Sequence, residues 1–191
     1  MRYQLFNGEK TVSNNIKMLK IYYRLCFLVS GLFLLLTIIL PFFLDKTGFV
    51  SIISDLFGII CHQNPERSIF VLGNSMPLCA RCFGMAVGTF VACCVGVLLT
   101  PVGSFFDRCM TYFHLPKEEK NLKYLAIILM ILMIPMMADG FIQLLTDYES
   151  TNVLRVMTGT IFGYARGVLL SSACLTVILY LIKIKNTRVK E

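Results

Sequence analysis

The chain has 191 residues, of which 57% are hydrophobic and 15% are charged, and its mean hydropathy is +0.73. Roughly a quarter of the residues in a soluble globular domain are charged, so this composition excludes an ordinary soluble domain and indicates an integral membrane protein. The net charge of +7 could indicate a nucleic-acid partner, but lysines and arginines gather only at the termini and in one loop, without interleaved aromatic residues. We therefore expect a lipid bilayer, and no nucleic acid, around this chain.

Four apolar stretches are long enough to cross a bilayer, because a spanning helix needs about 20 largely apolar residues. We predict spans over residues 25–44, 83–100, 124–145 and 158–182. A fifth run, at 49–60, is interrupted by Asp55 and is too short to span, so we expect a short interfacial or re-entrant helix there. The predicted fold is an all-α integral membrane bundle, with a basic segment at 1–24, a four-span membrane domain at 25–182 and a tail at 183–191.

Lysines and arginines are divided unevenly between the two sides of this predicted bundle. Thirteen of the eighteen lie in the N-terminal segment, the connection between the second and third spans, and the tail, against four in the other two connections. Short loops rich in these residues stay in the cytoplasm, so we expect a cell-membrane protein with both termini cytoplasmic. Most of the unusual polar residues then fall near the outer leaflet, which predicts one polar site there.

Small residues recur every four positions in two of the predicted spans. They are Gly84, Gly88, Ala92 and Gly96 in the second span and Gly159, Gly163 and Gly167 in the fourth. Small residues at this spacing let two helix backbones approach closely in lipid. We therefore expect the second and fourth spans to pack against each other.

Two charged residues fall inside the predicted spans, Asp139 in the third and Arg166 in the fourth. A charge near the centre of a spanning helix costs about 2.5–3.5 kcal/mol on insertion scales, so each is expected to have a partner. Arg166 is a natural partner for Asp139, and Gln143 shares a helix face with Asp139. The pair is either structural or functional; in the functional case Asp139 binds a metal or relays protons, while Arg155 or Arg166 binds an anion.

Cys61, His62, Cys79 and Cys82 are predicted to lie in the first outer connection or at the mouth of the second span. Three thiolates and an imidazole form a common tetrahedral zinc set, and a Cys-x-x-Cys lets two sulfurs reach one ion from a single turn. We therefore predict a site for zinc or another transition metal at these four residues. Neighbouring side chains diverge, so His62 is expected either as a ligand or as a proton acceptor beside the ligands.

An open coordination position would make such a metal catalytic, because the metal lowers the pKa of bound water. Asp139 or water is then the fourth ligand when only the three cysteines bind. Asp139, Arg155 and Arg166 are the catalytic candidates, and a small anionic or lipid molecule is the candidate substrate. The sequence leaves open whether the protein is an enzyme.

Two other classes of function use the same cysteines. Cys79 and Cys82, with Arg81 between them, could form an exchange-competent thiol pair at a helix start, as in a membrane thiol-disulfide oxidoreductase. Oxidoreductases of this kind pass electrons through a second cysteine pair. Only one further thiol, Cys61, is expected on the outer side, which argues against a complete electron relay. Alternatively, a disulfide from Cys61 pins the loop of a non-enzymatic scaffold or transporter, although the inner halves of the spans offer few polar residues for a transport path.

The stretches "CHQNPERS", "PLCARCFG", "DGFIQ" and "NVLRVMTGTIFG" resemble a family of small prokaryotic membrane proteins classed as a domain of unknown function. The resemblance runs from Cys61 to about Gly163 and implies a multi-pass membrane protein from a bacterium or archaeon. It implies no activity. The counterparts of the family signature in this chain are Cys61, His62, Gln63, Arg67, Ser68, Cys79, Arg81, Cys82, Gly84, Asp139, Gln143, Arg155, Thr158 and Gly159.

Overall fold

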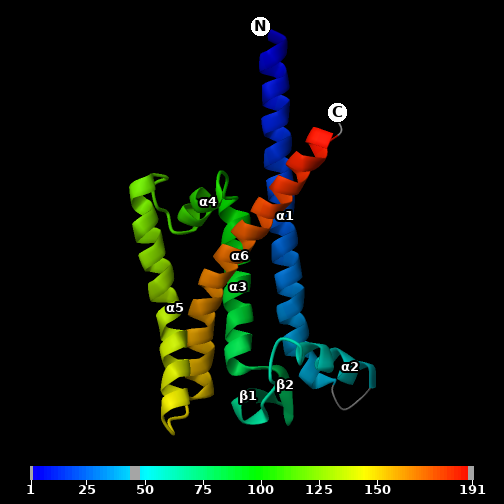
Figure 1. Cartoon of the computed structure of the whole chain (residues 1–191). Helices are drawn as coiled ribbons and strands as arrows, with labels where there is room; N and C mark the ends of the chain where they lie inside the picture. The colour runs from blue at the N-terminus through cyan, green and yellow to red at the C-terminus, as the bar shows by residue number, and fades with distance from the viewer. Residues whose placement is uncertain (1, 44–47, 189–191) are drawn as a thin grey trace.

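The structure is a computed structural model that describes residues 2–43 and 48–188 (Figure 1). Its long helices are α1 (Arg2–Ile39), α3 (Ala80–Leu99), α5 (Leu122–Leu145) and α6 (Asn152–Arg188), and its short ones are α2 (Gly48–Phe57) and α4 (Phe105–Tyr112). Strands β1 (Ser68–Val71) and β2 (Asn74–Cys79) form a hairpin, and 3₁₀ turns lie at η1 (Leu40–Phe42), η2 (Pro65–Arg67) and η3 (Glu119–Asn121). Residue 44 of the first predicted span and residues 189–191 of the predicted tail lie outside the described residues.

Four segments of these helices are long and apolar enough to cross a membrane. They are Ile16–Phe42, Ala80–Leu99, Glu119–Leu145 and Asn152–Lys185. The predicted all-α membrane bundle of four spanning helices is confirmed, and helix α2 covers most of the run expected to form a short helix. Figure 1 shows α2 and the β-hairpin at one end of the bundle, here called the cysteine end, and α4 at the opposite end, here called the α4 end.

Helix α6 begins six residues before the predicted fourth span. Asn152, Arg155 and Thr158 were expected in a loop or at its edge, but they belong to the first two turns of this helix. The backbone N–H of Arg155 donates to the Thr151 carbonyl, and the Thr151 hydroxyl accepts from the Leu154 N–H at 3.3 Å. Thr151 therefore acts as an N-cap, which lets polar residues start the helix before the apolar run begins.

The β-hairpin was not predicted from the sequence. Its two turn residues, Leu72 and Gly73, have φ values of +52° and +86°, and Val71 pairs with Asn74 across the turn. Positive φ at both turn residues is the geometry of the two-residue hairpin turns that match strand twist. The sequence lacks the Asn-Gly or Asp-Gly pair that usually signals such a turn, so the hairpin had no clear local signature.

Helices α3 and α6 pack through the predicted lines of small residues. A Cβ added at Gly88 would lie 2.1 Å from the Thr160 carbonyl oxygen, and one at Gly163 would lie 2.4 Å from the Met85 carbonyl oxygen. Backbones this close leave no room for a side chain, which confirms the expected contact between the two spans. Gly96 is an exception, because it faces Tyr23 and Tyr112 rather than α6.

The remaining helices are arranged around this central pair. Helix α1 packs against α3, and α5 packs against α6, whereas α1 and α6 touch each other very little. A buried cluster at the α4 end contains Cys109, Tyr112 and Val168, and a second one at the cysteine end contains Leu40, Phe57, Cys61, Leu78 and Ala86. The second cluster positions the predicted metal ligands.

Candidate metal centre

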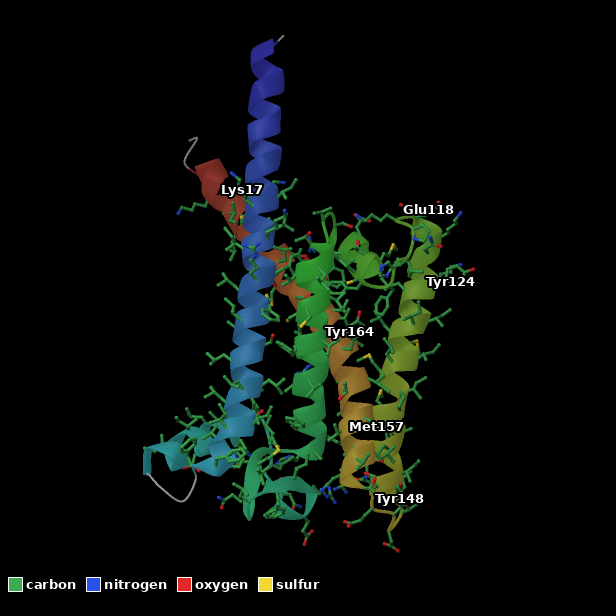
Figure 2. The ribbon with its side chains drawn as sticks, turned by 180° about the vertical axis from the view of Figure 1, so that it is seen from behind. Lys17, Glu118, Tyr124, Tyr148, Met157 and Tyr164 are labelled. Atoms are coloured by element: carbon green, nitrogen blue, oxygen red, sulfur yellow. The ribbon has the colours of Figure 1, made fainter. Side chains whose placement is uncertain are left out.

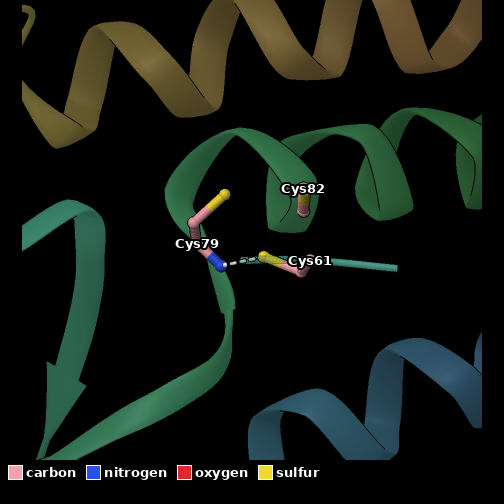
Figure 3. Close-up of side chains that lie close together, drawn as sticks. All are labelled: Cys61, Cys79 and Cys82. Carbon is pink, nitrogen blue, oxygen red and sulfur yellow. Dashed lines mark hydrogen bonds between the residues drawn. The ribbon is translucent and has the colours of Figure 1, made fainter. Parts of the chain in front are cut away.

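Three cysteines from three chain segments meet at the cysteine end. Cys61 follows α2, Cys79 ends β2, and Cys82 lies in the first turn of α3. Their sulfur atoms all lie within 4.8 Å of one another, as the close-up in Figure 3 shows. All three are free thiols in this structure. The structure therefore brings together three of the four predicted ligands, here called the cysteine cluster.

Backbone geometry around Cys61 directs two N–H groups at its sulfur. The Cys79 N–H donates to Cys61 Sγ at 3.1 Å, the dashed line in Figure 3, and the Gln63 N–H donates at 3.5 Å. Gln63 reaches this position with φ at +49°, in the left-handed region that a non-glycine residue rarely adopts. Its side-chain amide donates to the Pro77 carbonyl at 3.1 Å, which holds the loop against β2.

The cysteine cluster lies at the edge of a small hydrophobic core. Cys61 is 6% exposed and packs with Leu40, Phe57 and Leu78, whereas Cys79 and Cys82 are half-buried. Hydrogen bonds from the Cys79 and Cys82 thiols lower the pKa of the Cys61 thiol below its ordinary value, although burial acts in the opposite direction. The site therefore favours a thiolate at its most buried position, and the thiolate is the form that binds metals.

His62 lies apart from the three sulfurs. Its side chain is exposed, and it is not among the ligand atoms that lie within 4.8 Å of one another. Consecutive side chains point in different directions, so a chain that turns Cys61 into the core turns His62 toward the surface. The structure thus separates the two neighbouring residues that the sequence analysis grouped together.

The spacing of the three sulfurs fits one tetrahedral ion after a small adjustment. At a zinc–sulfur distance of about 2.3 Å, two sulfurs on one ion lie about 3.8 Å apart. Three thiolates would leave one coordination position for a further ligand. Asp139 does not fill that position in this structure, because it belongs to a separate polar cluster.

Asp139 pairs with Arg81 rather than with Arg166, which corrects the pairing expected from the sequence. Its Oδ2 accepts from Arg81 Nε at 3.0 Å and also from Arg81 Nη2. Arg81 opens α3 and Asp139 lies six residues before the end of α5, so both are at the cysteine end. Arg166 is eleven residues beyond Arg155 on α6, about 16 Å further along the helix, and is too deep to reach this carboxylate.

The polar cluster continues from Asp139 toward α6. Ser150 donates to Asp139 at 3.3 Å and accepts from Arg155 Nε at 3.0 Å, and the Gln143 amide donates to both Ser150 and Asp139. Arg155 is only 4% exposed and also donates to Asn152 at 3.3 Å. Arg81 pairs directly with the Asp139 carboxylate, whereas Arg155 is linked to it only through Ser150. Two guanidinium groups and one carboxylate leave the polar cluster with an excess positive charge beside the cysteines.

Sequence reasoning missed the roles of Arg81 and Ser150. Arg81 was considered only for its effect on the flanking thiols, because it precedes the predicted second span by two residues. Asp139 lies six residues inside the end of the predicted third span, so depth along the helices gave no signal for this ion pair. Ser150 had no signal, because a serine in a connection is ordinary, and only the fold places it between a carboxylate and a guanidinium.

Comparison with known proteins places these residues in a family. Residues 61–169 match the family described as predicted membrane protein (DUF2085), a segment that includes the cysteine cluster, Asp139, Arg155 and Arg166. An uncharacterized protein of Methanocaldococcus jannaschii is 39% identical over 150 residues, which cover 74% of this chain and 86% of that protein. An uncharacterized protein of Methanothermobacter thermautotrophicus is 34% identical over 116 residues, covering 59% of this chain and 86% of that protein.

No solved structure gives a significant match to the chain. The family match covers more than half of the chain and contains the β-hairpin and all three cysteines of the cysteine cluster. The chain therefore belongs to the DUF2085 family of predicted membrane proteins.

Proposed function

We propose that Cys61, Cys79 and Cys82 bind zinc or another transition metal that prefers thiolate ligands. The observation that carries the proposal is the approach of the Cys61 sulfur, from the loop after α2, to within 4.8 Å of the sulfurs of the Cys79-x-x-Cys82 pair. Zinc sites with three protein ligands keep the fourth position for water or substrate. An ion held here would polarise whatever occupies that position.

The surroundings of the cysteine cluster support a negatively charged metal centre. Three thiolates around a divalent cation carry a net charge of −1, whereas Arg81, Arg155 and Asp139 together carry +1. The N–H groups of Cys79 and Gln63 donate to the Cys61 sulfur, an outer-shell arrangement that orients ligands and stabilises bound thiolates. We assign Asp139 and Arg155 to charge balance and positioning through Arg81, and we assign them no metal coordination.

The distribution of lysines and arginines supports an orientation for this centre. The α4 end carries the positively charged connection and the basic ends of α1 and α6, which the positive-inside rule assigns to the cytoplasm. In our proposal the cysteine end therefore faces outward. The metal centre would then lie at the outer leaflet, near the polar residues that start α6.

Elemental analysis of the full chain, purified in a mild detergent under reducing conditions, tests metal binding directly. We expect close to one metal ion per chain in the natural protein and a several-fold loss in Cys82→Ser. Cys94→Ser is the matched control, because Cys94 lies on the same helix outside the cysteine cluster. Substitution with cobalt(II) should add thiolate charge-transfer absorption that the Cys82→Ser variant loses.

Thiol counting separates metal binding from the redox and staple functions that use the same sulfurs. After unfolding with a chelator, a metal site releases all eight cysteines for alkylation, whereas a disulfide in the cysteine cluster leaves six. Six thiols without metal would favour a disulfide or a redox pair. Eight thiols without metal, in protein prepared with zinc present and without reductant, would contradict the metal site and the structural disulfide.

A further inference from the structure

A groove opens between α1, α3 and α6, away from the cysteine cluster. It has a volume of about 580 Å³, and its walls are mainly apolar. Helix α3 forms the floor, since it packs against both α1 and α6 while those two helices touch each other very little. Phe33 lies at the end of the groove nearer the cysteine end, and Tyr22 and Ile178 lie at the opposite end. Thr89 and Arg166 form its polar centre, with Leu170 one turn further along α6.

Arg166 is the charged residue in the lining of this groove, and its guanidinium is only partly satisfied. Its Nη2 donates to the Thr89 hydroxyl at 3.0 Å, and its Nη1 lies 3.8 Å from the Met85 sulfur. Its Nε is buried and has no hydrogen-bond partner. Among the side chains that the structure describes, no carboxylate lies within ion-pair distance of it.

Arg166 also lies deep in the bundle. Gly159 packs against the Arg81 carbonyl at the start of α3, and Arg166 is seven residues further along α6, about 10 Å deeper. Figure 2 labels Tyr164, two residues earlier, near the middle of the bundle between Glu118 and Tyr148. A cation at that depth is costly when unpaired, and charged groups inside spanning helices typically mark a ligand or ion pathway.

We propose that this groove binds a single-chain amphiphile whose anionic head, a carboxylate or a phosphate, contacts Arg166. The head would accept hydrogen bonds from the guanidinium group and supply the missing negative charge, since charge-assisted hydrogen bonds of this kind are short and strong. The apolar chain would lie along α1 and α6 toward Tyr22 and Ile178. From Arg166 to Ile178 the wall of α6 is about 18 Å long, which suits a medium-length hydrocarbon chain.

This ligand site uses different side chains from the proposed metal centre, although Arg166 lies close enough to Cys82 for an electrostatic interaction. Arg166 contacts side chains of α3 and the groove, whereas the cysteine cluster is held by β2, the start of α3 and the loop after α2. Failure of either proposal therefore leaves the other standing.

Native mass spectrometry of the full chain in a nonionic detergent tests the groove, with dodecanoate, dodecyl phosphate and dodecanol as probes. We expect one bound anionic probe per chain and at least tenfold weaker binding of neutral dodecanol. Arg166→Gln should weaken binding of the anionic probes about ten- to a hundredfold, because it removes a charged donor. Arg166→Lys should retain part of the affinity, and the tighter of the two anionic probes identifies the head group.

Two further variants keep the test informative if Arg166→Gln fails to fold. Ser30→Phe leaves Arg166 intact but fills the groove, so it should abolish binding of both anionic probes. Arg67→Gln removes an exposed cation outside the groove and should leave binding unchanged. Bound dodecanoate should also slow alkylation of Cys174, an exposed thiol in the groove wall.

Equal binding of dodecanol and dodecanoate, or unchanged affinity in a folded Arg166→Gln variant, would overturn the proposal. So would a dimer that dissociates on Ser30→Phe without any amphiphile binding, because the groove would then belong to a second copy of the chain.

Discussion

Arg81 at the cysteine end and Arg108 at the α4 end each place a guanidinium group inside the bundle, but the two groups are satisfied in different ways. At the cysteine end, Arg81 forms an ion pair with the carboxylate of Asp139. At the α4 end, Arg108 is 2% exposed and donates only to neutral acceptors: the Gly103 carbonyl at 2.6 Å, the Ser172 carbonyl at 2.9 Å and the Thr176 hydroxyl. The sequence analysis had counted Arg108 simply as a loop charge.

This difference determines how much stability each end of the bundle loses when a single partner of its guanidinium group is removed. A cation paired with one carboxylate loses its counter-charge when that carboxylate is removed, and the uncompensated charge is then expensive to keep buried. A cation held by several neutral oxygens divides its stabilisation among them, so no single acceptor is essential. Removing Asp139 should therefore cost more than removing any partner of Arg108. Three measurements test this comparison.

The largest effect is expected from Asp139→Asn, which leaves Arg81 without its carboxylate partner. We expect the free energy of unfolding to fall by about 3 kcal/mol, at the low end for a broken buried pair because the Arg81 side chain is 21% exposed. Titration with a denaturing detergent in mixed micelles measures this free energy.

Glu149→Gln is the control, because the Arg67–Glu149 pair is exposed and 3.8 Å long. This variant should lower the free energy of unfolding by less than about 1 kcal/mol. Equal effects of the two variants would contradict the comparison.

An intermediate effect is expected from Arg108→Gln at the α4 end. This variant removes the charged donors that tie α4 to the backbone of α6, and we expect a cost of about 2 kcal/mol. The loss should be local, because α4 can open without disturbing the cysteine end. Alkylation of Cys109, which is fully buried in α4, should therefore accelerate while the reactivity of Cys61 stays constant. Acceleration at both cysteines would show that the ends unfold together.

The smallest effect is expected at the capping box that starts α4. Ser104 and Asp107 bond reciprocally, and hydrogen bonds from Ser104 hold the pKa of Asp107 below its ordinary value. A depressed carboxyl pKa gives a contribution to stability that is present above the unfolded pKa of about 4 and is lost as the pH falls through the folded pKa. Ser104→Ala should therefore cost about 1 kcal/mol at neutral pH and less in acid.

Unfolding titrations of Ser104→Ala at neutral and acid pH measure this difference. Asp107→Asn provides the control, since it removes the titrating group and should abolish the pH dependence of the cap. A Ser104→Ala cost that is the same at both pH values would show that the Asp107 carboxylate contributes nothing to the start of α4.

The spanning helices were predictable because each depends on local composition. About 20 apolar residues in succession have few alternatives to a helix in lipid, where every backbone polar group must find a partner within the chain. The packing of α3 on α6 was predictable for a similar reason: two lines of small residues mark faces that can approach closely. The hairpin at Leu72 and Gly73 was not predictable, because its turn lacks the usual residues.

The candidate site was only partly predictable. Cys79 and Cys82 share one turn of chain, so their proximity follows from spacing alone, and Cys61 was a reasonable third ligand. The separation of His62 from that group required the direction of the backbone at Cys61, which depends on the hydrophobic cluster around Leu40 and Phe57. Spacing in the sequence gives the types of ligand available but not the directions of their side chains.

By itself, the sequence determined that this protein is a four-span membrane bundle with chemically unusual residues near one end, because composition and periodicity act locally. Only the tertiary structure decided which charges meet: Arg81 with Asp139, and Arg166 with no carboxylate among the described residues. The physical reason is that ion pairing depends on depth and direction along neighbouring helices. Arg81 lies at the same end of the bundle as Asp139 and is neutralised by it, whereas Arg166 lies a few helical turns deeper and cannot reach that carboxylate.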